Sequence, residues 1–110
     1  MYEQGEIVVV PFPFSDLSSI KLRPVLILSK NKDNESSDDV ITCGITSNIK
    51  NDKYSIFIEN NNLDGGSIPK PSRIKLDKLF TLDQGIIKKK VAKIDKKTFN
   101  KVREEFTKLI

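Results

Sequence analysis

Short runs of apolar, mostly β-branched residues recur along this chain, and turn-forming residues separate them. The first two runs span residues 7–10 and 24–28, on either side of a polar segment. Runs of this length are typical of β-strands, and their close spacing is typical of an all-β sandwich or barrel. The pattern therefore favours a mainly β fold.

From the same pattern we predict strands at residues 6–12, 23–29, 40–46, 53–59, 73–79 and 87–94. Pro11 and Pro13 lack a backbone N–H, so the first strand should lie at a sheet edge or leave the sheet there. The run at 40–46 alternates poorly, which indicates burial on both faces. Residues 31–38 are interpreted as a polar surface loop, and residues 60–67 as a long, turn-rich connection.

The end of the chain carries a helical pattern. Asp95 can cap a helix N-terminus, and Phe99, Val102, Phe106 and Leu109 follow at helical spacing, so they share one face. For a chain of 110 residues we expect one domain, residues 1–110. Its expected architecture is a small SH3-like barrel of five to seven strands with a C-terminal helix packed across it.

Composition narrows the function classes. The chain has no His and a single Cys, Cys43, so the commonest acid–base residue is missing and a zinc site is nearly excluded. We expect no metal and no cofactor. No apolar stretch approaches the roughly 20 residues of a membrane span, and the N-terminus lacks the features of a signal peptide. Because a lone Cys cannot form an internal disulfide, we expect a cytoplasmic protein.

The net charge is +4 at pH 7, and it is unevenly placed. Residues 86–110 hold nine Lys or Arg against three Asp or Glu, so residues 1–85 carry a net negative charge. A basic end favours encounter with a polyanion. A Lys-rich surface that only aids solubility has the same composition, so charge alone leaves both interpretations open.

An arginine directly before an apolar strand is the first candidate for chemistry. Pro24 restricts Arg23 to an extended conformation, which would aim its five N–H donors from the rim of a rigid barrel. A guanidinium binds phosphate oxygens in pairs and stays charged at any working pH. An arginine paired with a nearby carboxylate would look the same in the sequence.

Hydroxyl and amide side chains follow the predicted third strand, at Thr46, Ser47 and Asn48. A hairpin-like arrangement would bring them beside the second strand and Arg23. Hydroxyl donors next to an arginine can share the charge of a phosphorane-like transition state. The same three residues also form an ordinary Ser/Thr/Asn turn, and both interpretations stay open.

Charged and apolar residues alternate along the predicted strand at 73–79. Side-chain direction repeats every two residues in a strand, so Arg73, Lys75 and Asp77 should share one solvent face. A solvated strand face explains this pattern without any activity. Asp77 is also a candidate base, because a chain without His needs another residue for proton transfer.

Four blocks of this sequence resemble the PemK/MazF family of toxin endoribonucleases, which belong to toxin–antitoxin pairs. The blocks agree in order and spacing and cover essentially the whole chain: GEIVVVPFPFSD, RPVLILS, ITSN and SRIKLDKLFTLD. Gly5 and Pro24 match as scaffold positions. The resemblance implies the small SH3-like barrel with a terminal helix, usually as a homodimer. Leu22 stands where many members have Gly, and Phe80 where many have Arg.

By position, the resemblance implies catalytic roles for Arg23 and Thr46, with Ser47 beside Thr46. Some members also use a basic residue and an acid two positions apart, and the acid falls on Asp77 here. The 15–22 loop helps to set which bases are read. The residues implied in substrate binding are Lys75, Arg73, Asn48, Ser15 and Lys21.

The implied activity is metal-independent, sequence-preferring cleavage of single-stranded RNA, often messenger RNA. In this reaction the ribose 2′-OH attacks phosphorus, giving 2′,3′-cyclic phosphate and 5′-OH ends, so DNA can at most bind. The implied partners are RNA, a second copy of the chain, and a cognate antitoxin whose acidic, flexible tail lies along the active-site groove.

Two other classes of function are weighed against this one. A toxin of the same barrel fold that poisons gyrase (CcdB-like) would act by protein binding alone, through aromatic and C-terminal contacts. This chain has no Trp and ends in Thr107-Lys108-Leu109-Ile110. We therefore rank the gyrase-poison class behind the endoribonuclease class. A degenerate nucleic-acid-binding homologue would bind RNA without cutting it and would not need Arg23 and Thr46 together.

Overall fold

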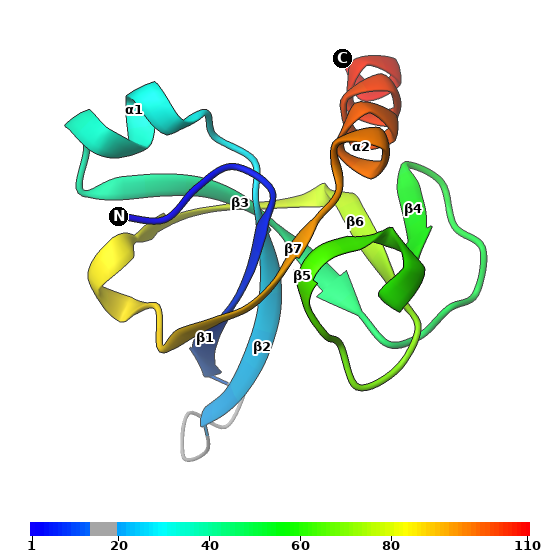
Figure 1. The fold of residues 1–110 in the computed structure, drawn as a ribbon, viewed down its shortest axis with the longest axis horizontal. Coiled ribbons are helices and arrows are strands. Elements are labelled where there is room, and N and C mark those ends of the chain that lie inside the picture. The colour runs from blue at the N-terminus through cyan, green and yellow to red at the C-terminus, as the bar shows by residue number, and fades with distance from the viewer. Residues whose placement is uncertain (14–19) are drawn as a thin grey trace.

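The computed structural model describes residues 1–13 and 20–110 (Figure 1). Ser15 therefore lies outside the described residues. The strands are β1 (Glu6–Pro13), β2 (Ile20–Ile27), β3 (Asp39–Thr46), β4 (Ser55–Ile58), β5 (Leu63–Gly66), β6 (Ser72–Asp83) and β7 (Lys89–Ile94). The α-helices are α1 (Asn31–Ser36) and α2 (Lys96–Leu109), and two short 3₁₀ helices lie at η1 (Asn60–Asn62) and η2 (Gln84–Ile86).

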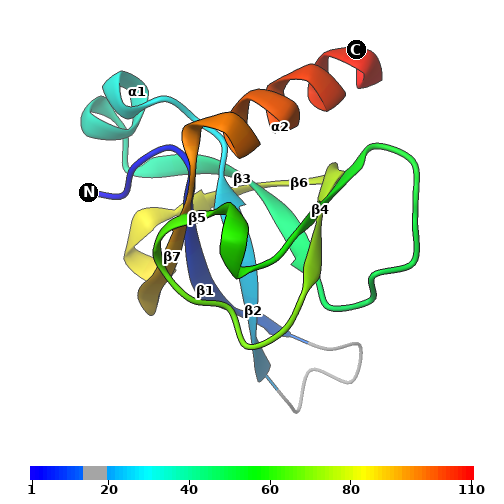
Figure 2. The ribbon, with the colours of Figure 1, turned by 45° about the vertical axis from the view of Figure 1, so that its right-hand side comes forward.

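All seven strands belong to one antiparallel sheet in the order β4-β6-β3-β2-β1-β7-β5. The sheet curls into a half-barrel, and α2 lies at the end where β7 leaves it (Figures 1 and 2). The predicted mainly β barrel with a C-terminal helix is confirmed. β7 pairs with β1 only from Glu6 to Val9, so Pro11 and Pro13 lie beyond the part of β1 that is paired on both sides.

The two faces of the sheet bury different side chains, because direction alternates along each strand. One face carries the larger core, where Ile7, Leu26, Cys43 and Ile74 pack with Phe99 and Phe106 of α2 among others. The opposite face carries a smaller cluster built on Val8, Val10, Val25 and Ile27. The structure therefore has an apolar interior on one side and a second, partly open face on the other.

Helix α2 begins as the sequence predicts. The Asp95 side chain accepts a hydrogen bond from the Thr98 amide at 2.7 Å and caps the helix. Val102 is 1% exposed and belongs to the larger core, whose flank Phe99 and Phe106 cover. The amphipathic stripe thus docks the helix on the barrel. No described helix is long and apolar enough to span a membrane.

The predicted loop at 31–38 is wrong in part, because residues 31–36 form α1. Asn34 explains the difference. Its side chain is 1% exposed, donates to the Tyr2 and Ser29 carbonyl oxygens at 3.1 and 3.0 Å, and accepts from the Ser29 hydroxyl at 2.6 Å. These long-range contacts stabilise one helical turn in a segment whose composition is that of a loop.

The connection at 60–67 also contains more structure than predicted, namely η1 and β5. β5 pairs with the outer edge of β7, although its sequence Leu-Asp-Gly-Gly has no strand pattern. Gly66 has a φ of +74°, and a Cβ there would lie 2.1 Å from the Val91 carbonyl oxygen. The backbones of β5 and β7 approach each other so closely at Gly66 that no side chain fits there. A glycine at this position therefore allows β5 to pair with β7.

Two boundaries of the predicted strands differ from the observed ones by three residues or more. β2 begins at Ile20 rather than residue 23, and β6 continues to Asp83 rather than ending at residue 79. β3 is buried on both faces at its centre, where Thr42 and Cys43 are inaccessible to solvent, whereas Ile41 is 48% exposed.

Candidate functional site

A cavity of about 630 Å³ opens on the face of the sheet that carries the smaller apolar cluster. Strands β1, β2, β3 and β6 and the connection between β3 and β4 contribute to it. Its lining residues are Phe12, Arg23, Pro24, Gly44, Ile45, Thr46, Asn48, Lys50, Asn51, Asp52, Lys75, Lys78 and Phe80.

Strand register brings Arg23 and Thr46 together. β2 and β3 are antiparallel, and Val25 pairs with Gly44. This is the last pair of the ladder at that end, and Arg23 and Thr46 each lie two residues beyond it, so both are on the same face of the sheet. Both residues line the cavity. Lys75 joins them from the other side of β3, where it pairs with Gly44.

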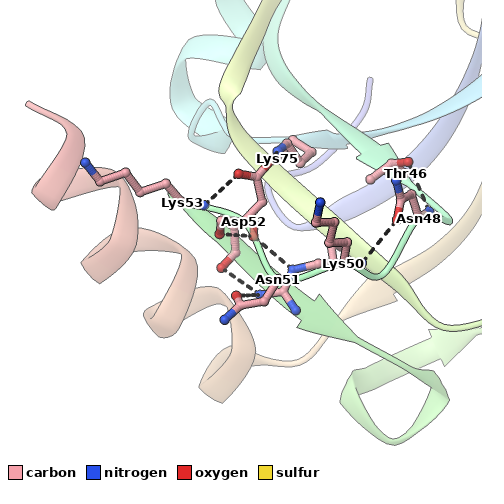
Figure 3. Close-up of polar contacts among 9 residues, drawn as sticks. Thr46, Asn48, Lys50, Asn51, Asp52, Lys53 and Lys75 are labelled. Carbon is pink, nitrogen blue, oxygen red and sulfur yellow. Dashed lines mark hydrogen bonds and ion pairs between the residues drawn. The ribbon is translucent and has the colours of Figure 1, made fainter.

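The Thr46 hydroxyl is oriented by a local turn (Figure 3). Its oxygen accepts a hydrogen bond from the Asn48 amide at 3.1 Å, and the Asn48 side chain accepts from the Lys50 amide, also at 3.1 Å. A hydroxyl carries one donor besides its acceptor lone pairs. The accepted bond therefore leaves the hydroxyl hydrogen of Thr46 available to donate into the cavity. The segment is both an ordinary Thr/Asn turn and part of the cavity wall.

Two basic residues of β6, Arg73 and Lys75, hold the connection between β3 and β4, and Figure 3 shows Lys75 beside Asp52. Lys75 forms an ion pair with Asp52. Arg73 donates from Nε to the Ser55 hydroxyl at 2.9 Å and from Nη2 to the Asn51 side-chain oxygen at 3.2 Å. Arg73 is half-buried and does not line the cavity, so its guanidinium serves the loop rather than the cavity.

The cavity is strongly cationic. Arg23, Lys50, Lys75 and Lys78 line it, and Asp52 is the one carboxylate among its described lining residues. The hydrogen bond from Lys75, together with the Lys53 amide and the charge of Lys75, holds the pKa of Asp52 below its ordinary value. Such a site suits a ligand with more than one negative charge.

Three other predicted site residues lie outside the lining of the cavity. Ser47 is exposed at the end of β3, and Lys21 is exposed on β2. Asp77 is exposed on β6, at an irregularity where the pairing with β3 passes from Lys75–Gly44 to Leu79–Cys43. None of the three is among the residues that line the cavity. Asn48 does line it.

A model of the family described as PemK-like, MazF-like toxin of type II toxin–antitoxin system matches residues 3–110. The chain belongs to this family. The resemblance expected from four sequence blocks is thereby confirmed. A search of curated proteins found no match to this toxin-family chain.

Solved structures share the fold of this PemK/MazF-like chain. A mycobacterial endoribonuclease in complex with its cognate antitoxin has a TM-score of 0.79 at 18% identity, with 98% of this chain and 93% of that chain covered. Mycobacterium tuberculosis toxin MazF-mt6 has a TM-score of 0.75 at 17% identity, with 94% and 93% covered. A chain of the MazE–MazF structure from Deinococcus radiodurans has a TM-score of 0.76 at 19% identity, with 98% and 94% covered.

Two positions that depart from the common PemK/MazF pattern lie at or near the cavity. Phe80 lines it and contacts Phe12 with ring centroids 5.1 Å apart and planes inclined by 54°. Leu22, directly before Arg23, is 52% exposed. The aromatic pair is an apolar part of a cavity that is otherwise rich in cations.

Sequence reasoning missed several lining residues: Lys50, Asp52, Lys78 and Phe12. Phe80 was visible only as a departure from the common pattern. Asp52 and Lys50 lie in a polar connection, and no local signal separates them from ordinary loop residues. The pairing with Lys75, 23 residues further along the chain, is what brings Asp52 to the cavity.

Proposed function

We propose that this chain is the toxin of a type II toxin–antitoxin pair and acts as a metal-independent, sequence-preferring endoribonuclease on single-stranded RNA. The observation that carries the proposal is the cavity that both Arg23 and Thr46 line. Membership of the family and the endoribonuclease names of structures with the same fold support it.

The proposed reaction is an internal transesterification. The ribose 2′-oxygen forms a bond to the adjacent phosphorus and loses its proton, while the bond from phosphorus to the 5′-oxygen of the next nucleotide breaks. That leaving oxygen takes up a proton. The products are a 2′,3′-cyclic phosphate and a 5′-OH end. The nucleophile belongs to the substrate, so the protein needs no metal to generate one, and only RNA is cut.

Arg23 and Thr46 meet the charge that develops on phosphorus oxygens. The guanidinium binds two oxygens at once, and the Thr46 hydroxyl hydrogen, left available by the turn at Asn48, adds a third donor. Donors of this kind are typically worth about 10²–10³ in rate each. Ser47, Asn48 and Lys75 would position neighbouring parts of the strand.

The placement of Asp77 outside the cavity lining does not support the role of base that the sequence suggests for it. Asp52 does line the cavity, but a carboxylate whose pKa is lowered by Lys75 is a poor proton acceptor. The proposal therefore rests on stabilisation of the transition state by Arg23 and Thr46.

Three further points follow from family membership as proposals. We expect a homodimer, a cytoplasmic location, and a cognate antitoxin whose acidic segment occupies the cationic cavity. The MazE–MazF structures and the mycobacterial toxin–antitoxin complex support the last expectation. A pull-down with the product of the neighbouring small gene tests it.

The decisive experiment incubates the protein with a long defined RNA in EDTA and maps the cut ends. We expect cleavage at a few preferred sites, with 2′,3′-cyclic phosphate and 5′-OH ends. Arg23→Ala should lower the cleavage rate by at least about a hundredfold without changing thermal unfolding, because Arg23 is exposed. Lys97→Ala, on the exposed side of α2, is the matched loss of one positive charge and should cut normally.

Loss of all cleavage on chelation would point to a different nuclease chemistry. Full activity of Arg23→Ala would remove the proposed site. Binding of RNA without any product would favour the degenerate homologue instead.

A further inference from the structure

The cavity contains a carboxylate where a phosphate-binding site would be expected to have none. Asp52 lies on the connection between β3 and β4 and reaches the Lys75 ammonium on β6 (Figure 3). Its neighbours along the cavity wall include Lys50, and Arg23 and Lys78 line the same cavity. Among the described lining residues, this carboxylate is the one anionic group beside four cations.

The two side chains of the Lys75–Asp52 ion pair differ in their exposure to solvent. The Lys75 side chain is 13% exposed, whereas that of Asp52 is 60% exposed. Lys75 therefore lies deep in the wall, and Asp52 covers it from the solvent side. A phosphate that enters the cavity therefore competes with the Asp52 carboxylate for the Lys75 ammonium.

Contacts other than the ion pair with Lys75 hold the loop in shape. The Ser55 hydroxyl donates to the Asp52 carbonyl oxygen at 2.6 Å, and the Leu76 amide donates to the Tyr54 carbonyl oxygen at 2.9 Å. Arg73 binds Asn51 and Ser55. These contacts hold the backbone between β3 and β4. Asp52 reaches Lys75 through Oδ2, while its Oδ1 accepts from the Lys53 amide, so the contact with Lys75 can be given up while the wall stays in place.

We propose that the Asp52 carboxylate is an internal counterion for Lys75, which a phosphate of the RNA strand displaces on binding. Asp52 thereby sets the affinity of the cavity for the RNA backbone, and Lys75 becomes a phosphate contact only in the complex. This inference rests on the proposed function, because it takes the cavity to be the RNA site.

The Asp52 carboxylate and an RNA phosphate would compete for Lys75 at similar free energy. A solvent-exposed ion pair contributes little to stability, so its loss on binding is a small cost against the new contact with a phosphate. The hydrogen bond from Lys75 and its charge lower the pKa of Asp52, and Lys50 adds to the effect. Displacement by a phosphate should therefore raise the pKa of Asp52, because the favourable cation is lost and a second anion arrives.

Asp52→Asn tests the proposal in the full chain. The amide keeps the size of the side chain and an oxygen that can accept from the Lys53 amide, as Oδ1 does at 2.9 Å. The probe is a single-stranded 2′-O-methyl RNA oligonucleotide, which has no 2′-OH to attack and stays intact. We expect Asp52→Asn to bind it about three- to fivefold more tightly than the wild type. This is the scale of one exposed ion pair.

Asp64→Asn is the matched control. Asp64 is exposed on β5 and does not line the cavity, and its substitution changes the net charge by the same amount. It should bind the oligonucleotide as the wild type does. A second measurement uses the unmodified protein: NMR titration of the Asp52 carboxyl carbon should show its pKa rising when the oligonucleotide is added. This readout also decides the matter if Asp52→Asn disturbs the loop.

Unchanged or weaker binding by Asp52→Asn would overturn the inference, as would an Asp52 pKa that stays low in the complex. An equal gain in affinity for Asp64→Asn would also overturn the inference, because the tighter binding would then come from the change in net charge alone. If any of these three results came with normal RNA cleavage by the wild type, the proposed function would stand without this inference. Failure of the wild type to bind or cut RNA would remove both.

Discussion

At the scale of single residues, the candidate site depends on groups that are few and individually ordinary. Arg23 was predictable because Pro24 restricts it and because a charged residue before a buried strand is unusual. Thr46 was predictable only as one of two open interpretations, a turn or a site. In the structure Thr46 both accepts the turn contact from Asn48 and lines the cavity.

Replacement of Thr46 by Val separates the hydroxyl from the shape of the side chain. We expect Thr46→Val to lower the rate of RNA cleavage by about a hundredfold or more, the effect of removing one transition-state donor. Thr46→Ser keeps the hydroxyl and should retain most of the rate. Cleavage of a short fluorescent RNA, followed under single-turnover conditions, measures the effect.

Thermal unfolding of both Thr46 variants serves as the control, since a folding defect would lower the rate for another reason. Equal rates for the Val and Ser variants would show that the hydroxyl takes no part in the reaction. The site would then have to be rebuilt around Arg23 and the lysines.

At the scale of elements, β6 does more than its alternating pattern indicates. Its apolar residues Ile74 and Leu76 enter the larger core, while Arg73 and Lys75, on the other face, hold the connection between β3 and β4. The sequence predicts one solvent face for Arg73, Lys75 and Asp77. Arg73 and Lys75 do share a face, but they are half-buried against this connection, and Asp77 is exposed at the irregularity of the pairing. Their use as loop anchors could not be predicted, because their partners are distant in sequence.

The N-cap of α2 provides a test of stability against pH. Hydrogen bonds from the Thr98 side chain and amide hold the pKa of Asp95 below its ordinary value, so the folded state favours the ionised carboxylate. The resulting stabilisation is complete above the unfolded pKa of about 3.9 and is lost as pH falls through the lower folded value. We expect Asp95→Ala to lower the free energy of unfolding by about 1 kcal/mol at pH 7.

Urea unfolding at a series of pH values measures this difference. The difference in unfolding free energy between Asp95→Ala and the wild type should narrow below about pH 4. At that pH the Asp95 carboxylate of the unfolded wild type begins to take up a proton, while the folded state still favours the ionised form. Asp95→Asn keeps a capping oxygen without the charge and should show no such narrowing relative to Asp95→Ala. A gap that stays constant down to pH 2 would contradict the assignment of the pKa shift to this cap.

At the scale of the whole molecule, charge and curvature act together. The half-barrel leaves one face of its sheet partly open, and four cations gather there. The basic C-terminal part belongs to β7 and α2, and none of its residues lines this cavity. The net charge of +4 is therefore a poor guide to where an anionic ligand binds.

Salt dependence of binding tests this distinction. Neutralising phosphates of a single strand changes the logarithm of the binding constant by about 0.7 per contact for each tenfold change in salt. Four contacts, from Arg23, Lys50, Lys75 and Lys78, predict a slope of about −3 for the 2′-O-methyl oligonucleotide. Fluorescence anisotropy over a range of sodium chloride concentrations measures it.

Arg23→Ala should reduce that slope by about 0.7, whereas Lys97→Ala on α2 should leave it unchanged. An equal reduction in both variants would indicate that the basic helix, rather than the cavity, binds the strand.

The sequence by itself determined the fold class, the cap and apolar stripe of α2, and the family, because these depend on local spacing and on residues close together in the chain. It also indicated Arg23 and Thr46, since an Arg-Pro pair before an apolar run and a polar segment after one are recognisable local patterns. Only the tertiary structure decided that Asp52 reaches Lys75, that Phe80 lies beside Phe12, and that Asp77 stays outside the cavity. These outcomes follow from strand register and from the bulge between Lys75 and Leu79, and a pairing that joins distant residues leaves no trace in the local pattern.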